Sequence, residues 1–188
     1  MQEEFLIAGF GGQGVMFAGQ LLAYAAMGEG LHVTWIPSYG PEMRGGTAHC
    51  YVVISDRPIG SPVVRRPRVV MAFNNPSFEK YESYTAPQGL LAYNVSLIEA
   101  NSGREDVIRL PVPATDLADE TGDLRLANVV MLGAVLTAHP VLPVAAIRRA
   151  LDEHIPAHHR DLLPRNLEAL DKGVAFAARL GEAVAHLG

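Results

Sequence analysis

The chain has a single cysteine, Cys50, among its 188 residues. A lone cysteine rules out an intrachain disulfide, and it cannot supply the four thiolates that normally hold an iron–sulfur cluster. Structural zinc sites built from several cysteines are excluded for the same reason. We therefore expect no metal site and no cluster held by this chain alone.

Positive charge is also scarce. The sequence contains 15 Lys and Arg against 20 Asp and Glu, which gives a net charge of -5, and its basic residues form no long run. Binding along a nucleic-acid backbone needs a positive stripe, so we expect no such partner. The first residues, "MQEE", are acidic where a secretory signal would be basic, and a cytoplasmic location is expected.

Two stretches lack charged side chains altogether, residues 5–28 and residues 126–147. Either is long enough to span a bilayer. However, the first contains a glycine-rich turn, and the second contains Asn128, Pro140 and Pro143. Irregular backbone is not tolerated against lipid, so we predict buried elements of a globular core and no membrane span.

Short apolar runs alternate with helical patterns along the chain. This order is typical of a sheet covered by helices on both faces. We predict a single domain over residues 1–188, with a Rossmann-like three-layer α/β/α sandwich around a mixed, mostly parallel sheet. The expected strands are 4–8, 31–36, 47–55, 69–73, 89–95 and 107–110. The expected helices are 15–27, 76–84, 124–139, 144–154 and 167–187, the last of which Gly173 could interrupt.

The glycine loop "GFGGQGV" (residues 9–15) follows the first predicted strand and opens the first helix. Gly9, Gly11 and Gly14 match the G-x-G-x-x-G spacing of dinucleotide-binding loops. An NAD site also needs an acidic residue after the second strand, but that strand ends at residues 35–38 without one. The pattern alone leaves two interpretations open, a phosphate-binding loop or close packing of a helix on a strand.

A second loop, "PSYGPEMRGGTAHC" (residues 37–50), combines glycine with many polar side chains. Loops at the carboxyl ends of parallel strands line the ligand crevice of an open α/β sheet. We therefore expect both loops to face the same crevice. The composition favours a binding site or an interface over an exposed pair of Glu42 and Arg44 on a flexible turn.

Together, "GFGGQGV" and "PSYGPEMRGGTA" closely resemble the gamma subunit, or gamma domain, of the 2-oxoacid:ferredoxin oxidoreductases. Two later segments, "ANVVMLGAV" (127–135) and "NLEALDKG" (166–173), resemble that family less specifically. The resemblance covers nearly the whole chain. The amino-acid sequences of the two N-terminal motifs are most similar to those of the 2-oxoglutarate branch.

The resemblance implies a division of labour between chains. Enzymes of this family oxidatively decarboxylate a 2-oxoacid with coenzyme A, giving acyl-CoA, carbon dioxide and reduced ferredoxin. Thiamine diphosphate, magnesium and 4Fe-4S clusters are expected on partner subunits, named alpha, beta and in some cases delta. The gamma region is a scaffold near the entry of coenzyme A and is inactive alone. Ferredoxin would be an indirect partner, and the isolated chain could form a homodimer.

We expect the two loops to contact coenzyme A or a partner subunit, and we expect no catalytic residue in this chain. The candidate residues are Gly9, Gly11, Gly12, Gln13, Gly14, Ser38, Tyr39, Gly40, Glu42, Arg44, Gly45, Gly46 and Thr47. Our hypothesis is that Arg44 pairs with a phosphate or a partner carboxylate, because guanidinium binds either in a bidentate manner. Glu42 would orient Arg44 or contact the partner.

Several other polar residues are interpreted as structural. Cys50 and His49 are neighbours on a predicted strand and should point to opposite faces, so a Cys–His nucleophile is not expected. Asn128 opens an apolar helix, where a buried amide needs a cap or a hydrogen bond to another element.

Two clusters of basic side chains remain. We interpret His154, His158 and His159 as solvated, because Pro156 breaks the helical register that would pair them. Residues 65–68 contain three arginines, which we interpret as a solvated turn, with a phosphate or an acidic partner surface as the alternative.

Three functions remain open on the sequence alone. The first is a subunit of a 2-oxoacid oxidoreductase, whose 2-oxoacid is not determined. The second is a free-standing oxidoreductase that binds NAD or flavin at the glycine loop. The third is an assembly module that binds no small molecule.

Overall fold

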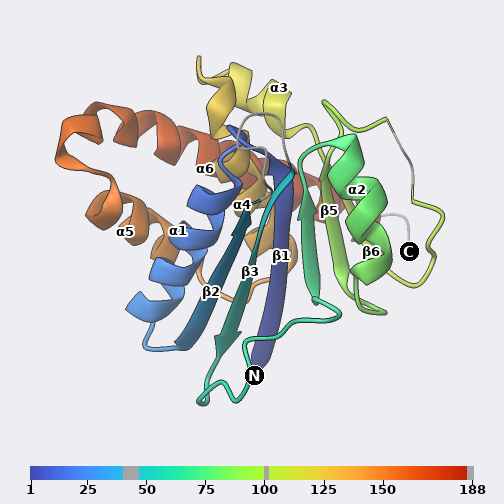
Figure 1. Cartoon of the computed structure of the whole chain (residues 1–188). Coiled ribbons are helices and arrows are strands. Elements are labelled where there is room, and N and C mark those ends of the chain that lie inside the picture. The colour runs from blue at the N-terminus through green and yellow to red at the C-terminus, as the bar shows by residue number, and fades with distance from the viewer. Residues whose placement is uncertain (40–46, 100–101, 186–188) are drawn as a thin grey trace.

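The protein folds around a six-stranded sheet (Figure 1). The computed structural model describes residues 1–39, 47–99 and 102–185. The elements in chain order are β1 (Gln2–Phe10), α1 (Val15–Gly28), β2 (His32–Tyr39), β3 (Thr47–Ser55), β4 (Val69–Ala72), α2 (Asn75–Tyr81), η1 (Glu82–Tyr84), β5 (Leu90–Asn94), β6 (Ile108–Val112), α3 (Ala114–Asp119), η2 (Leu124–Leu126), α4 (Ala127–Ala138), α5 (Val144–His154), η3 (Ala157–Leu162) and α6 (Leu163–Ala185).

The strands are ordered β2-β3-β1-β4-β5-β6 across the sheet. β3 is antiparallel to both of its neighbours, β1 and β2. The neighbours from β1 through β4 and β5 to β6 are all parallel. β3 is therefore the strand that runs against the other five, and the prediction of a mixed, mostly parallel sheet is confirmed.

The apolar run of β1 is buried on both sides of the sheet. Phe5 and Ile7 belong to the core between the sheet and α1, while Leu6 and Ala8 belong to the smaller core beneath α2. All four side chains are fully buried, which explains why this strand is continuously apolar instead of alternating.

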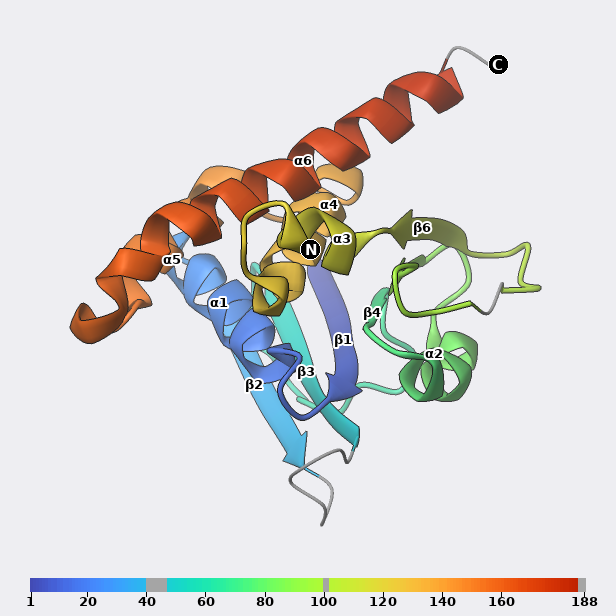
Figure 2. The same ribbon diagram turned by 90° about the horizontal axis from the view of Figure 1, so that it is seen from above.

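Helices lie on both faces of the sheet, as the α/β prediction required. Figure 2 shows α1, α4, α5 and α6 on one face and α2 on the other. α2 packs on β4 and β1. The second face therefore carries only one of these helices, and the last residue of α2, Tyr81, contacts His49 of β3.

Several element boundaries differ by a few residues from the sequence-based expectation, and one short helix was not expected. β2 runs on to Tyr39, three residues past the predicted end, because it pairs with β3 in a hairpin register of Pro37 with Cys50 and Tyr39 with Ala48. Proline is tolerated there because β2 is an edge strand. α3 occupies part of the segment that we expected to be an irregular polar stretch before residue 124.

The last helix, α6, begins at Leu163 and continues through Gly173 without a break. At this point α6 crosses α4 at close range. A Cβ atom on Gly173 would overlap the carbonyl oxygen of Val130, and one on Gly133 would overlap that of Leu170. The two glycines let the helix backbones touch, so α4 is buried along almost its whole length. Among the described residues, no helix is long and apolar enough to cross a membrane.

We predict that Gly173→Ala destabilises the chain by about 1–3 kcal/mol, the usual cost of overpacking, because α4 and α6 must move apart. Gly181→Ala is the matched control in the same helix, since no atom lies within 4 Å of the added methyl group. This change should stabilise the helix by about 0.5–1 kcal/mol. Urea unfolding monitored by circular dichroism measures both, and equal shifts in the two variants would contradict the close helix contact.

Candidate functional site

The glycine loop lies at the carboxyl end of β1, beside the carboxyl end of β4 (Figure 2). From β1 the chain continues into α1 on one face, and from β4 it continues into α2 on the opposite face. In open α/β sheets this change of direction marks the crevice where ligands bind. The fold therefore places the loop at the position where a site is expected.

Gly14 fixes the start of α1. Its φ of 70° is in the left-handed region, and a Cβ atom here would overlap the side chain of Asn128. Asn128 is 3% exposed, and its Nδ2 donates a hydrogen bond of 3.0 Å to the carbonyl oxygen of Gly14. The prediction that Asn128 bonds to another element is confirmed, and Gly14 serves close packing.

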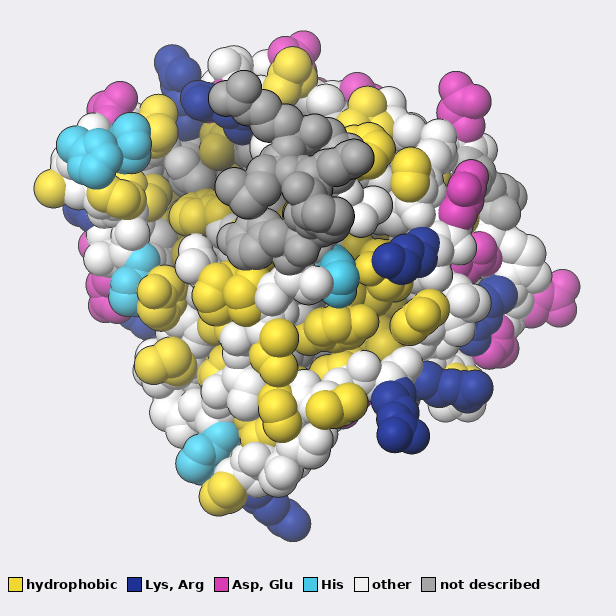
Figure 3. Space-filling view, viewed as in Figure 1, with side chains coloured by type: hydrophobic (Ala, Val, Ile, Leu, Met, Phe, Trp, Pro, Cys, Tyr) yellow, Lys and Arg dark blue, Asp and Glu magenta, His cyan; other side chains and the backbone are white. Residues whose placement is uncertain are grey.

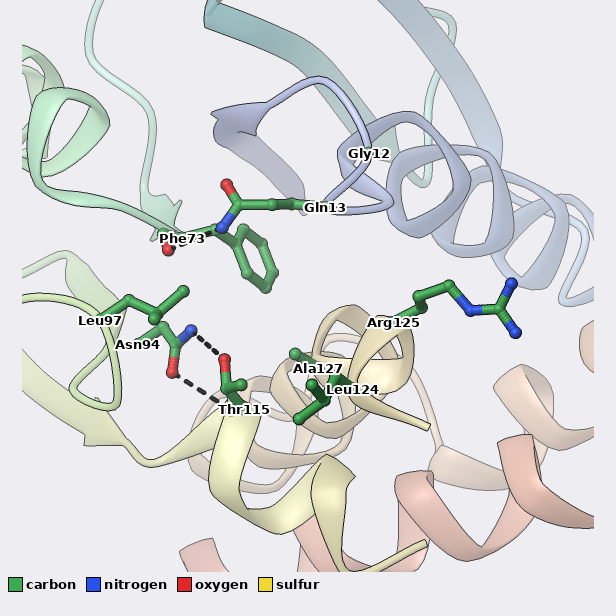
Figure 4. Close-up of a pocket in the computed structure, with 9 residues that line it drawn as sticks. All are labelled: Gly12, Gln13, Phe73, Asn94, Leu97, Thr115, Leu124, Arg125 and Ala127. Carbon is green, nitrogen blue, oxygen red and sulfur yellow. Dashed lines mark hydrogen bonds between the residues drawn. The ribbon is translucent and has the colours of Figure 1, made fainter. Parts of the chain in front are cut away.

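Gln13 bridges the ends of β1 and β4. Its Oε1 accepts hydrogen bonds from the backbone N–H of Phe10 at 2.7 Å and from Nδ2 of Asn74 at 2.8 Å. Its Nε2 donates to the carbonyl oxygen of Phe73 at 3.3 Å (Figure 4). A Cβ atom on Gly9 would lie only 2.7 Å from this Oε1. The space between the two strand ends is thus filled by the Gln13 amide.

The outer part of the glycine loop, residues 11 and 12, is exposed. A Cβ atom on Gly12 would have no neighbour within 4 Å. The following helix has no side-chain cap at its N-terminus. Gly9 and Gly14 therefore pack against the protein, whereas Gly11 and Gly12 present backbone to the surroundings.

Two cavities flank the loop and share Gly12 and Arg125. The first, of about 240 Å³, is drawn in Figure 4 and is lined mainly by residues that follow the parallel strands and by η2. The second, of about 260 Å³, lies at the start of α1 against η3 and α6. Arg125 is largely exposed and pairs with Asp123 at 2.6 Å, and this hydrogen bond holds the pKa of the Asp123 carboxyl below its usual value.

The ends of the second loop reach the same end of the sheet. Thr47 pairs with Phe10 across β3 and β1, and Tyr39 pairs with Ala48 across β2 and β3. Ser38 and Tyr39 belong to β2, not to a loop as predicted. The other candidates in this loop lie outside the described residues, namely Gly40, Glu42, Arg44, Gly45 and Gly46.

The strand order argues against an NAD site. In dinucleotide-binding folds the second strand lies next to the first, which brings its terminal acidic residue to the ribose. Here β3 separates β2 from β1, and the described residues of β2 contain no acidic side chain. The glycine spacing is therefore present without the second half of the dinucleotide site.

Cys50 and His49 lie on opposite faces of β3, as predicted. Cys50 is fully buried, its Sγ donates to the carbonyl oxygen of Val15 at 3.6 Å, and burial raises the pKa of its thiol to about 12. His49 lies on the other side of the sheet, with its ring 5.5 Å from that of Tyr51. Cys50 is a structural residue of the core.

The histidine at the end of α5 and the two that follow it make separate ring contacts. His154 stacks on Tyr24 with ring centroids 3.8 Å apart, and the rings of His158 and His159 lie 4.2 Å from each other. No cluster of three metal-ligating side chains occurs in the parts of the chain that the structure describes.

Two residues at this end of the sheet were missed by the sequence analysis. Asn74 caps α2 by accepting from the N–H of Ser77 and also bonds Gln13. Its position directly after a buried strand is the sequence feature that could have identified Asn74 as a residue of this site. Arg125 follows no strand, and only the tertiary structure brings it to the glycine loop.

These features define a Rossmann-like α/β domain whose glycine loop is held to the strand ends by Gln13 and to α4 by Asn128. Residues 4–176 match the family described as "Pyruvate ferredoxin/flavodoxin oxidoreductase". The chain belongs to this family.

Named relatives agree with this assignment. The chain is 40% identical over 172 residues to the ketoisovalerate oxidoreductase subunit VorA of Methanothermobacter thermautotrophicus, covering 91% of this chain and 35% of VorA. It is 32% identical over 183 residues to the 2-oxoglutarate synthase subunit KorC of Methanocaldococcus jannaschii, covering 96% of both chains. It thus spans about a third of the first relative and nearly all of the second.

Solved structures show the same fold. The gamma subunit of a keto/oxoacid ferredoxin oxidoreductase from Geobacter sulfurreducens matches with a TM-score of 0.84 and 25% identity, over 95% of this chain and 98% of that chain. A 2-oxoglutarate:ferredoxin oxidoreductase from Magnetococcus marinus matches with a TM-score of 0.86 and 26% identity, over 95% of this chain and 31% of that chain. The resemblance to a gamma subunit or gamma domain is confirmed.

We predict that iodoacetamide does not label Cys50 in the folded chain at pH 8. A pKa of about 12 leaves about one thiol in ten thousand ionised, and the thiolate is the reactive form. Because folding raises this pKa above 9.0, the neutral thiol supports stability below pH 9, and that contribution is lost as the pH rises towards 12. Mass spectrometry of labelled protein, with a urea-unfolded sample as control, tests this; equal labelling in both samples would show that Cys50 is accessible.

Proposed function

We propose that the chain is the gamma subunit of a multi-subunit 2-oxoacid:ferredoxin oxidoreductase. The enzyme would convert a 2-oxoacid and coenzyme A into acyl-CoA and carbon dioxide and pass the electrons to ferredoxin. The observation that carries this proposal is the match to KorC, a 2-oxoglutarate synthase subunit, over 96% of both chains. Alpha, beta and in some cases delta subunits would hold thiamine diphosphate, magnesium and the 4Fe-4S clusters.

The chemistry of this chain supports a scaffolding role. Its one cysteine is buried beneath α1 and cannot hold a cluster. The Gln13 amide occupies the space between the carboxyl ends of β1 and β4. Its hydrogen bonds there are to the protein itself. A role in positioning partner chains, without catalysis in the isolated subunit, is consistent with both features.

The substrate has two candidates. The amino-acid sequences of the N-terminal motifs favour 2-oxoglutarate, which is also the compound in the name of the KorC relative, a 2-oxoglutarate synthase subunit. A branched-chain 2-oxoacid is the second candidate, since identity to the ketoisovalerate oxidoreductase subunit is 40%, against 32% for KorC. The domain itself binds neither acid in this proposal.

We also propose that the exposed part of the glycine loop contributes to coenzyme A binding. Gly11 and Gly12 leave backbone accessible beside the uncapped N-terminus of α1, where N–H groups and the helix dipole favour a phosphate. Arg125 borders both cavities next to Gly12 and adds a guanidinium group. Contact with a partner subunit is the alternative use of the same backbone.

We predict that anaerobic affinity purification of this chain from its native cells recovers brown partner chains. The eluate should reduce a viologen dye in a reaction that depends on coenzyme A and on one 2-oxoacid. A panel containing 2-oxoglutarate, 2-oxoisovalerate and pyruvate identifies the substrate. Recovery of a colourless chain that binds NAD or flavin would instead support the free-standing oxidoreductase. A colourless chain that binds neither would support an assembly module outside this enzyme class.

We predict that Gly12→Asp in the assembled enzyme raises the KM for coenzyme A by about tenfold, because a carboxylate would face the phosphate. Gly12→Asn is the matched control, since Asn and Asp have nearly the same shape and carry the same backbone strain at the positive φ of 99°. The KM for the 2-oxoacid should stay constant in both variants. Identical coenzyme A kinetics in the two variants would assign the loop to packing or to a subunit contact.

A further inference from the structure

One half of the sheet is covered by helices on only one side. Along β3, Cys50 and Val52 face α1, so His49 and Tyr51 must face the opposite side. Along β2, Trp35 faces α1 and Ile36 faces away. α2 packs mainly on β4 and β1 and reaches this surface at one edge, where Tyr81 contacts His49. We call this surface, with the adjoining η1, the bare face; it comprises Ile36, His49, Tyr51 and Tyr84, which are partly or largely exposed, beside the buried Tyr81.

The bare face is aromatic. The ring of His49 lies 5.5 Å from the rings of both Tyr51 and Tyr81, and Tyr81 lies 5.5 Å from Tyr84. Tyr84 is 41% exposed and Ile36 is 39% exposed. Figure 3 views the molecule from this side and shows hydrophobic side chains gathered over its middle, with Lys and Arg side chains bordering them on the right.

A group of unpaired arginines lies at the edge of the bare face. Arg65, Arg66 and Arg68 are exposed and form no ion pair with any described residue. Their segment is held next to η1, because the N–H of Ala86 donates to the carbonyl oxygen of Pro67 at 3.0 Å. This positive charge is unusual in a chain whose net charge is -5.

Lys80 is a further basic side chain near this surface. The Nζ of Lys80 lies 4.9 Å from the centre of the Tyr81 ring. By contrast, several arginines elsewhere in the described chain have acidic partners, among them Arg104, Arg148 and Arg149. The bare face thus combines the exposed Tyr84 with a border of arginines that form no ion pair with any described residue.

We propose that the bare face is the docking surface for the thiamine-binding chain of the complex, at a site where that chain presents apolar side chains bordered by carboxylates. This inference rests on the proposed function. Tyr and Arg are the residue types enriched at protein–protein interfaces, where they supply most of the binding energy. A carboxylate border on the partner would complement the arginines and speed association.

A second copy of this chain fits the bare face less well. In a two-fold symmetric dimer the same surface patch meets itself. The residues that define the bare face include no carboxylate, so this patch of a second copy would offer the arginines of residues 65–68 no acidic partner. The complementary surface therefore belongs to a different chain.

The charge of the border is tested with the double variant Arg65→Glu/Arg66→Glu in the tagged chain. Neither side chain has an ion-pair partner among the described residues, so the fold and its melting temperature should be unchanged. Association with the thiamine-binding chain, measured by biolayer interferometry, should weaken about tenfold or more, and binding of the unaltered chain should weaken with added salt. Arg179→Glu on α6 is the matched control, because Arg179 is exposed and bonds only a backbone carbonyl of its own helix.

The aromatic part is tested with Tyr84→Ala, which should weaken association by about tenfold or more if Tyr84 is an anchor of the interface. Tyr24→Ala is its control, since Tyr24 on α1 is exposed to nearly the same extent, 40% against 41%. The control should leave association unchanged. Equal effects from Tyr24→Ala and Tyr84→Ala, or from Arg179→Glu and the double variant, would overturn the assignment of the surface.

The remaining outcomes separate this inference from the proposed function. If the unaltered chain recovers thiamine-binding partners and the bare-face variants recover as much, the proposed function stands and the bare face is not the docking surface. If the unaltered chain recovers none, both fail. A homodimer that dissociates on Tyr84→Ala, or a raised KM for coenzyme A with association intact, would assign the bare face to a second copy or to a small anion and overturn the proposal.

Discussion

The contact between Gly14 and Asn128 holds the functional end of the sheet together. It joins the start of α1 to the start of α4 through one hydrogen bond, at a position where any side chain on residue 14 would collide with the amide. α4 is in turn fixed by α6, because Gly133 and Gly173 let the two helix backbones touch. The glycine loop is therefore positioned by packing that begins more than a hundred residues away along the chain.

The two sides of the sheet are covered to different extents. One side is closed by α1, α4, α5 and α6, which bury most of the apolar core. The other side carries α2 alone and exposes aromatic side chains beside arginines that have no described acidic partner. A chain whose sheet is covered by helices on one face and is partly uncovered on the other is suited to be one component of a larger assembly. The proposed function requires such a component.

The glycine spacing shows how a local pattern acquires its meaning from topology. Gly9, Gly11 and Gly14 have the spacing of a dinucleotide loop, and the strand–turn–helix unit forms as that spacing predicts. The antiparallel β3 then separates β1 from β2, and Gln13 fills the space between β1 and β4. The same short motif thus supports helix packing at two glycines and leaves only Gly11 and Gly12 accessible.

The sequence by itself determined the α/β class, most strand positions and the buried state of Cys50, because these follow from short-range apolar patterns and from the alternation of side chains along a strand. It also indicated the family, because the residues of the two N-terminal loops are specific to it. Only the tertiary structure decided that β2 continues to Tyr39, that Asn74 and Arg125 lie beside the glycine loop, and that α2 packs mainly on β4 and β1. These features depend on strand order and on contacts between distant segments, which no local pattern encodes.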